Sequence, residues 1–223
     1  MSPRSRFSLT ALIFLLSCQP AFPAATQKAA VPEPVRITVR VYNYARIESY
    51  RLERTQRRVS EIFIEAGFEI DWIHCARCEA ERSQYPDCIR EIGPTDLILK
   101  IMPRIDMEKN GFKKDAFGLA AGRNIMISTE RLDDIAQNSE QTCDRIIGLA
   151  VAHEIGHDLL GSNSHSSRGI MCPRWYPKDL HLESRRSAGF TQEQIDRMHR
   201  NWLAAQDADR PGGTMRTARI PER

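Results

Sequence analysis

The predicted fold is built around the stretch "CDRIIGLAVAHEIGHDLLG", residues 143–161. Its pattern predicts an α-helix over residues 143–160 that is apolar nearly all round, and such a helix lies buried in a core. The apolar positions are Ile146, Ile147, Leu149, Val151, Ile155 and Leu159. Asp144 suits the first turn of this helix, and Gly161 is typical of the residue that ends one.

Within this helix the letters "HEIGH" place two histidines four residues apart. His153 and His157 therefore project from one face, and both imidazoles can reach one zinc ion at about 2.0–2.1 Å. Glu154 stands about 100° round the helix from His153, so it can hold a zinc-bound water instead of binding the metal. Zinc would make that water acidic and polarise a substrate carbonyl, and Glu154 would take the proton. The pattern predicts a zinc-dependent hydrolase.

A catalytic zinc ion takes three protein ligands and keeps one open position. The predicted third ligand is His165, which the chain can reach because Gly161 lets it turn back after the helix. One alternative is that His165 is an exposed loop histidine in a Ser- and Asn-rich turn. Another is that a downstream carboxylate completes the site, and Glu183 is the best placed.

The order of these residues resembles the signature of the metzincin metalloproteases, H-E-x-x-H-x-x-G-x-x-H followed by a Met-turn. Here Gly161 and His165 follow the second histidine by four and eight residues instead of three and six. "HSS" at 165–167 and "GIMCP" at 169–173 resemble the passage to the Met-turn. In this resemblance Met171 forms the apolar floor under the zinc and is not a ligand.

The chain is also similar to a group of small bacterial exported metzincins. The similarity lies in "RITVRVYN" at 36–43, "LGSNSHSSRGIM" at 160–171, Trp175 and "FTQEQIDRMH" at 190–199. It implies a zinc metalloendopeptidase with one catalytic Zn²⁺ ion. Tyr176 would correspond to the tyrosine that some metzincins place after the Met-turn, although its distance from the methionine is long.

The resemblance implies an α/β (α+β) fold: a mixed, twisted sheet packed with helices, then the Met-turn and a C-terminal helix. An edge strand from "FGLAAGRNIMIS" at 117–128 would pair with an extended peptide substrate. The sequence itself predicts strands and one further helix by their apolar spacing. The strands are 35–44, 68–74, 96–102 and 123–129, the helix is 49–66, and 104–117 is a loop.

The N-terminus has the pattern of a signal peptide over residues 1–17: Arg4 and Arg6 precede the apolar run at 9–17. "LLSC" at 15–18 resembles a bacterial lipobox, which predicts lipidation of Cys18 and a flexible tether over 18–34. The alternative is that Cys18 merely ends a secretory signal. We expect an exported protein, anchored in the bacterial envelope by lipid or otherwise soluble in the periplasm or secreted.

Five cysteines follow Cys18, and an oxidising compartment favours disulfides among them. The predicted bridges are Cys75 or Cys78 to Cys88, and Cys143 to Cys172, with one thiol left over. A metal site in "HCARC" at 74–78 is the alternative, but no second ligand pair follows at zinc-ribbon spacing.

Residues 35–206 are expected to form one catalytic domain, likewise expected to be monomeric, and 207–223 a disordered tail. Without residues 1–17 there are 30 basic and 29 acidic residues, and this balance excludes a dedicated nucleic-acid binder. Two other functions remain open: an envelope binding protein that zinc only stabilises, with Cys172 as a fourth ligand, and a zinc amidase acting on a cell-wall amide. The presence of Glu154 favours an enzyme over the zinc-stabilised binding protein, because a purely structural zinc site would have no use for a base.

Overall fold

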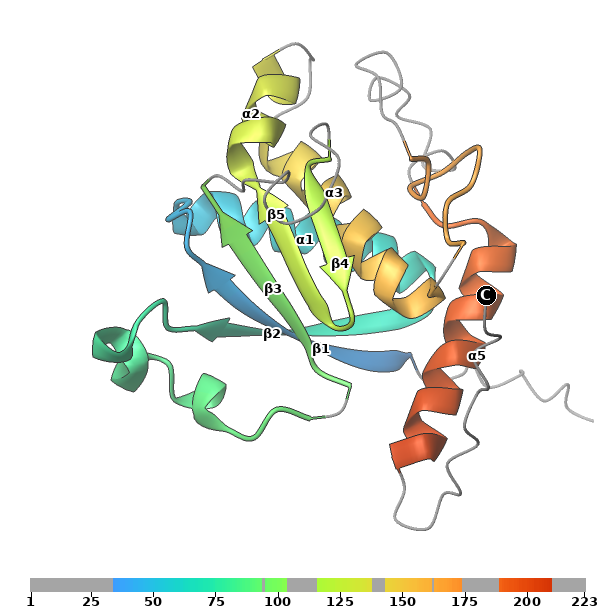
Figure 1. Ribbon diagram of the computed structural model, residues 1–223, viewed down its shortest axis with the longest axis horizontal. Coiled ribbons are helices and arrows are strands. Elements are labelled where there is room, and N and C mark those ends of the chain that lie inside the picture. Colours follow the sequence, from blue (N-terminus) through green and yellow to red (C-terminus); the bar gives the residue numbers. More distant parts are fainter. Residues whose placement is uncertain are drawn as a thin grey trace, which may run out of the picture. The chain divides into compact units, whose positions relative to one another are not determined.

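Five strands form one mixed sheet: β1 Val35–Asn43, β2 Phe68–Cys75, β3 Leu97–Met102, β4 Gly118–Ala121 and β5 Asn124–Ser128. Their order across the sheet is β2-β1-β3-β5-β4 (Figure 1). All neighbouring pairs are parallel except β4 and β5, which are antiparallel. The predicted mixed sheet and its four predicted strands are confirmed, and β4 is a fifth strand within the stretch 117–128.

The chain divides into residues 1–33 and a unit from Pro34 onward, and every residue that the computed structural model describes belongs to the second. The described residues are 34–93, 95–103, 116–137, 143–161, 163–173 and 189–209. Several sequence predictions concern residues outside these ranges. They are the signal peptide, Cys18 and its tether, most of the loop 104–117, Trp175, Tyr176, Glu183 and the tail beyond Asp209.

Alternation of apolar side chains explains the central strands. Ile37, Val39 and Val41 of β1 are buried, and Val39 stands opposite Leu97 of β3 in the parallel register. β4 has no such pattern, because its sequence is Gly-Leu-Ala-Ala. It exists as a strand because it pairs antiparallel with β5, with Gly118 opposite Ile127.

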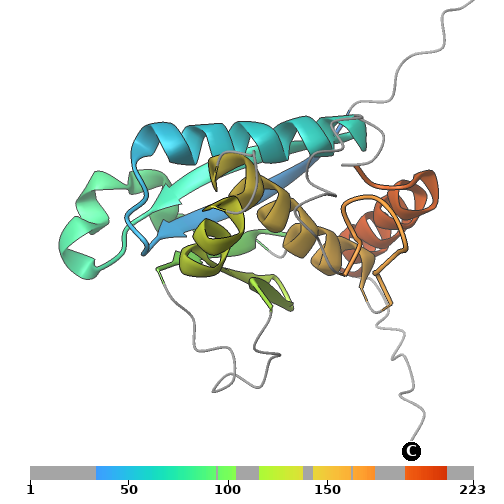
Figure 2. The same cartoon turned by 90° about the horizontal axis from the view of Figure 1, so that it is seen from above.

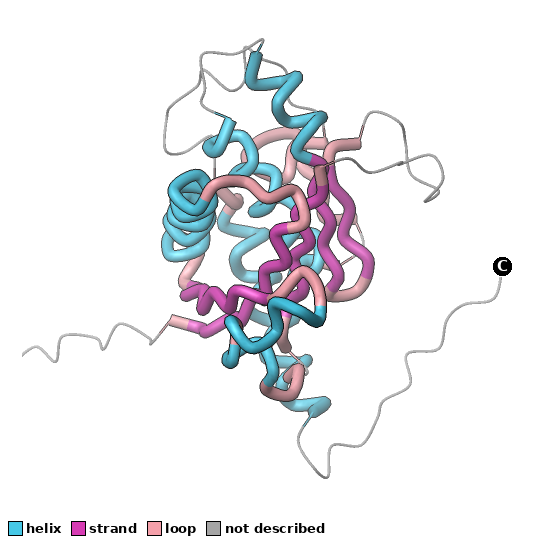
Figure 3. The backbone as a smooth tube through the Cα atoms, turned by 90° about the vertical axis from the view of Figure 1, so that its left-hand side faces the viewer, coloured by secondary structure: helices cyan, strands magenta, loops and turns pink. Residues whose placement is uncertain are grey.

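Within the described ranges, four α-helices accompany the sheet: α1 Ser49–Glu65, α2 Thr129–Gln137, α3 Cys143–Leu160 and α5 Gln192–Asp209. Helices α1 and α3 pack against each other and lie on the same face of the sheet (Figures 1 and 2). In the side view helix α1 is seen nearly end-on, to one side of the twisted strands (Figure 3). None of the described helices combines the length and apolar character that a membrane span requires.

Helix α3 is the central helix of this layer, as its sequence predicts. Its buried residues lie on every side, and it contacts α1, α2, α5, β4 and β5. Gly161 ends it with φ of +72°, a left-handed conformation that glycine adopts without steric cost. The helix therefore holds "HEIGH" at a fixed place beside the edge of the sheet.

The cysteine loop after β2 contains two short 3₁₀ helices, Glu79–Gln84 and Pro86–Ile89. A disulfide joins Cys75 to Cys88, which confirms one of the two local bridges that the sequence allowed and excludes Cys75 as a metal ligand. The buried guanidinium of Arg40 holds the end of this loop, because it donates to the backbone carbonyls of Cys88 and Glu91.

The predicted bridge from Cys143 to Cys172 is wrong, because both residues carry thiols. Cys143 begins α3, where its thiol donates to Asp133. The segment before Cys172 packs at the other end of the helix, where Met171 lies against Gly156. Those thirteen helical residues span about 20 Å, whereas a disulfide needs Cα atoms within about 7 Å.

Candidate metal centre

Three histidines converge beside the end of α3. His153 and His157 come from the helix and His165 from the segment after it, and each can offer one ring nitrogen within 4.8 Å of the other two. The Nε2 atoms of His153 and His157 are 3.0 Å apart. Two nitrogens on one tetrahedral zinc ion stand about 3.4 Å apart, so these side chains fit a single ion after a small adjustment.

The partner of His153 decides which of its nitrogens is available to a metal. Its Nδ1 lies 2.7 Å from the carbonyl oxygen of Ile170. A carbonyl only accepts hydrogen bonds, so Nδ1 must carry the proton. In the neutral ring, Nε2 then presents its lone pair toward His157, which is the tautomer that a metal ligand requires.

His157 has its own partner in the return loop, the segment 161–166 that follows α3 and carries His165. Its Nδ1 lies 2.6 Å from Oγ of Ser164, the residue before His165. The hydroxyl fixes the ring plane of His157 and leaves Nε2 directed toward His153. The loop thus brings in one further ring nitrogen, from His165, and also orients a histidine already on the helix.

Burial keeps both helical histidines neutral. Removal from water lowers the pKa of His153 to about 4, against a smaller opposing effect of its bond to Ile170. Burial and then the neighbouring His153 and His165 lower the pKa of His157 to about 4. Neutral imidazole is the metal-binding form, so both rings are available to a cation at neutral pH.

Glu154 is buried beside the histidines, with 5% of its surface exposed. This burial raises the pKa of its carboxyl to about 8. A carboxyl with such a pKa can accept and release a proton near neutral pH, which suits a general base and acid.

The carboxyl of Glu154 lies against the edge strand. A Cβ atom at Gly118 would stand 2.9 Å from Cγ and Oε1 of Glu154, a distance that real Cβ atoms do not tolerate. The amide of Ser128 donates to the carbonyl of Phe117, and hydrogen bonding alternates along antiparallel strands. It follows that the backbone groups of Gly118 and Ala120 point away from β5, toward the outer edge of the sheet.

Met171 packs beneath the same turn of α3. It is fully buried, and its sulfur lies 2.6 Å from where a Cβ of Gly156 would stand. The neighbouring Ile170 supplies the carbonyl that holds His153. The segment predicted as a Met-turn thus supports the histidines from below with one apolar side chain and one backbone acceptor.

The other predicted candidates do not join the three histidines. Cys172 is not part of the cluster, and no carboxylate of the described ranges is either. His74 is exposed near Gln56, while His199 bonds to the carbonyl of Ala66, so both serve elsewhere. Glu183 lies outside the described residues.

Sequence reasoning missed three residues that shape this site: Ser164, Gln194 and Gly118. The capping-box pattern Thr191-x-x-Gln194 was a signal for the start of α5, but it gave no indication that the glutamine also reaches the return loop. A glycine in a short apolar strand is a signal of close backbone approach, which is the role of Gly118. No local pattern marks Ser164 as the partner of a histidine seven residues earlier.

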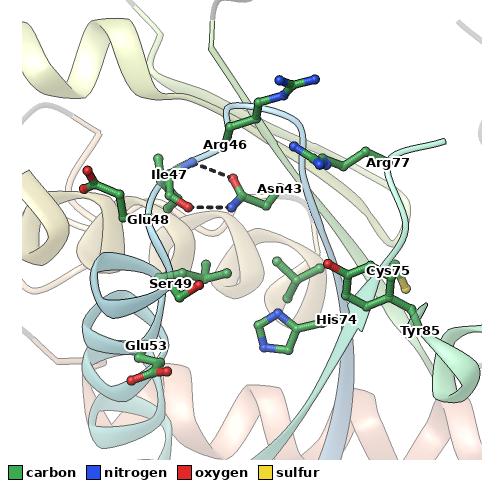
Figure 4. Close-up of a pocket in the computed structure, with 12 residues that line it drawn as sticks. Asn43, Arg46, Ile47, Glu48, Ser49, Glu53, His74, Cys75, Arg77 and Tyr85 are labelled. Carbon is green, nitrogen blue, oxygen red and sulfur yellow. Dashed lines mark hydrogen bonds between the residues drawn. The ribbon is translucent and has the colours of Figure 1, made fainter. Parts of the chain in front are cut away.

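A separate hollow of about 390 Å³ lies at the carboxyl ends of β1 and β2, beside the first turn of α1 (Figure 4). None of the three site histidines lines it. Its charged groups are of both signs, and the side chain of Asn43 closes one wall by bonding to both backbone groups of Ile47. It is a mixed polar hollow and provides no second cluster of metal ligands.

Comparisons with known proteins find similarity among solved structures alone. No family model matches the chain, and no curated protein does. Among solved structures, archaemetzincin from Methanopyrus kandleri is similar over 77% of this chain and 97% of its own, with 18% identity and a TM-score of 0.43. A zinc-dependent peptidase from Methanocorpusculum labreanum is similar over 71% and 92%, with 14% identity and a TM-score of 0.41. Both TM-scores lie below 0.5, so the site's own geometry has to support any assignment.

Proposed function

We propose that this protein is a zinc-dependent metallopeptidase, a hydrolase that cleaves peptide bonds. The observation that carries the proposal is the convergence of His153, His157 and His165 beside the buried Glu154. Three imidazole nitrogen donors and no fourth described protein ligand form the donor set of a catalytic zinc ion. A purely structural zinc site would fill the fourth position with a side chain.

Zinc bound by the three histidines would supply a Lewis acid, which polarises the peptide carbonyl and lowers the pKa of water. Glu154 accepts a proton from the attacking water at its carboxylate and then donates it to the nitrogen of the leaving amine. The burial that raises its pKa favours this uptake. The carbonyl of Ile170 and the hydroxyl of Ser164 keep two of the rings oriented throughout.

The substrate that fits best is an extended peptide or protein segment. Gly118 and Ala120 direct backbone groups to the outer edge of β4, and no described strand pairs on that side. An extended chain can add there by main-chain hydrogen bonds. Because Gly118 touches Glu154, a peptide bound along this edge passes close to the proposed general base.

We assign the site to the metzincin type. The support is the order of His153, Glu154, His157, Gly161, His165 and Met171, together with two contacts. Met171 lies against Gly156 of the helix, and the residue before it holds His153. The loop between the second and third histidines is two residues longer than the metzincin signature, and the three rings still converge.

We also propose that the protein is exported and carries a lipid at Cys18. This rests on "LLSC" and the apolar run before it in the sequence. Radiolabelled palmitate should enter the wild type expressed in a bacterial host and should not enter Cys18→Ala. Equal labelling of the two would leave an ordinary secretory signal.

The test of the enzyme activity measures zinc content and hydrolysis of a mixed peptide library. Wild type should hold one zinc ion per chain and cleave peptides. Glu154→Ala should retain zinc and lose activity, while His165→Ala should lose about tenfold or more in zinc affinity. His74→Ala is the matched control, because this histidine is exposed outside the cluster, and it should behave as wild type. Undiminished activity in Glu154→Ala would contradict the proposal.

A further inference from the structure

The loop that carries His165 is held from outside by helix α5. Gln194 lies in the first turn of that helix and is buried, with 8% of its surface exposed. Its Nε2 donates to the carbonyl of Ser164 at 3.3 Å and reaches Oγ of Ser166 at 3.0 Å. One amide group therefore contacts the residues on both sides of His165.

The same side chain also closes the start of α5. The backbone amide of Thr191 donates to Oε1 of Gln194 at 2.9 Å, and the amide of Gln194 donates to Oγ1 of Thr191 at 3.3 Å. This reciprocal pair is a capping box. The two polar atoms of this amide thus have different roles, because Oε1 caps the helix and Nε2 holds the loop.

The contacts continue from the loop to both helical histidines. Ser164 orients His157 through its hydroxyl. The amide of Ser166 donates to the carbonyl of Met171, next to the Ile170 carbonyl that holds His153. Displacement of Ser164 and Ser166 would therefore disturb the rings on the helix as well as His165.

We propose that Gln194 is a positioning residue for the metal centre, which holds the long return loop so that the third histidine meets the other two. This proposal rests on the proposed function, in which the three histidines bind zinc. A longer loop can adopt more conformations, so fixing its two ends does not by itself fix the position of His165. Contacts with another part of the chain are needed to hold the loop in the conformation that binds the metal. Gln194 supplies these contacts from the C-terminal helix.

The substitution Gln194→Glu separates the capping role from the role in holding the loop. Glutamate keeps the acceptor oxygen and is well suited to the third position of a capping box, so α5 stays capped. It has no N–H to donate to the carbonyl of Ser164. Asn201→Ala is the matched control, because it removes another amide of α5, one that donates to the carbonyls of Leu159 and Leu160 and not to the loop.

Three measurements test the proposal: zinc affinity by chelator competition, hydrogen exchange of the Ser166 amide without metal, and Tm without metal. Gln194→Glu should bind zinc about tenfold or more weakly and exchange faster at Ser166, with a Tm close to wild type. Asn201→Ala should lower Tm and leave zinc affinity and Ser166 exchange unchanged.

The outcomes separate this proposal from the one on which it rests. Wild-type zinc affinity and wild-type exchange in Gln194→Glu would overturn the positioning role. Losses of zinc affinity that follow Tm equally in both variants would also overturn it, because the role would then be structural. A wild type that binds no zinc would overturn the proposed function itself, and exchange at Ser166 would still decide whether Gln194 holds the loop.

Discussion

Gly118 of the edge strand lies so close to Glu154 of helix α3 that no residue larger than glycine fits at position 118. A Cβ atom on Gly118 would stand 2.9 Å from both Cγ and Oε1 of Glu154, and 2.8 Å from Cδ1 of Ile127. Ile127 is fully buried, so the crowding cannot be relieved on that side. The place where a peptide would bind and the group that would serve as base are therefore fixed relative to each other.

Gly118→Ala should reduce peptide hydrolysis by about tenfold or more while zinc content stays at the wild-type level. The added methyl group must push the Glu154 carboxyl from its place, and misplacement by about 1 Å can cost a hundredfold in rate. The three histidines are not touched by the change. Steady-state hydrolysis and metal analysis measure the two effects separately.

The control for Gly118→Ala is Ala121→Ser, on the same strand but exposed. It should retain activity within about twofold. Full activity in Gly118→Ala would show that the carboxyl of Glu154 has room to move without consequence.

Stability without metal should depend on pH through Glu154. Its pKa is raised to about 8 in the folded protein, so the folded state binds this proton more tightly than the unfolded state. The contribution of this proton to the free energy of unfolding is fully present below about pH 4.5. It is lost as pH rises toward 8, by up to about 1.4 kcal/mol per pH unit. Glu154→Gln does not titrate, so it should gain stability over wild type across this window.

Urea unfolding in the presence of a chelator at pH 5, 6.5 and 8 checks this expectation. His153 and His157 act in the opposite direction, because burial lowers their pKa and stability is lost as pH falls from about 6.5 to 4. They titrate in both proteins, so the difference between variant and wild type isolates Glu154. A difference that stays constant with pH would contradict the assigned cause.

The sequence was most informative where one element determines its own structure. The apolar spacing of α3, the alternation in β1 and the glycine after the helix are local patterns, and the structure has each of them as expected. The spacing of His153 and His157 belongs to the same class, because one helix holds both rings. Convergence of His165 required a loop path that no local pattern fixes, and there the prediction rested on the turn at Gly161 together with a resemblance.

The failures concern contacts between segments of the chain. The resemblance placed an edge strand within 117–128, but the sequence Gly-Leu-Ala-Ala carries no strand signal of its own, and β4 is a strand because it pairs with the adjacent β5. Gln194 reaches Ser164 across thirty residues of sequence. The wrong bridge between Cys143 and Cys172 has the same origin, since the two lie near opposite ends of α3. Helix α2 was also missed, although it follows β5 directly.

Arg40→Met should destabilise the fold by about 3–5 kcal/mol. The guanidinium of Arg40 is fully buried, and its Nε lies 2.8 Å from Oδ2 of the buried Asp96. Methionine fills the space but leaves the carboxylate uncompensated, which is the costly way to break a buried ion pair. The carbonyls of Cys88 and Glu91 lose their donors as well. The free energy of unfolding in urea measures the loss.

Arg36→Met on the same strand is the matched comparison for Arg40→Met. The Arg36 side chain is 66% exposed and pairs with Glu69 and Asp71 at the surface, where such pairs contribute at most about 1 kcal/mol. Equal losses in the two variants would mean that the buried network contributes no more than a surface pair.

The cysteines should differ sharply in reactivity toward iodoacetamide at pH 8. Cys78 is exposed and should be alkylated first. Burial, with the neighbouring Asp133 as a second cause, raises the pKa of Cys143 to about 12, so this thiol stays protonated and should react only when urea unfolds the chain. Cys75 and Cys88 should resist until a reductant opens their bridge. Peptide mass spectrometry reads each site, and a peptide linked through Cys143 and Cys172 would contradict the distance that α3 sets between them.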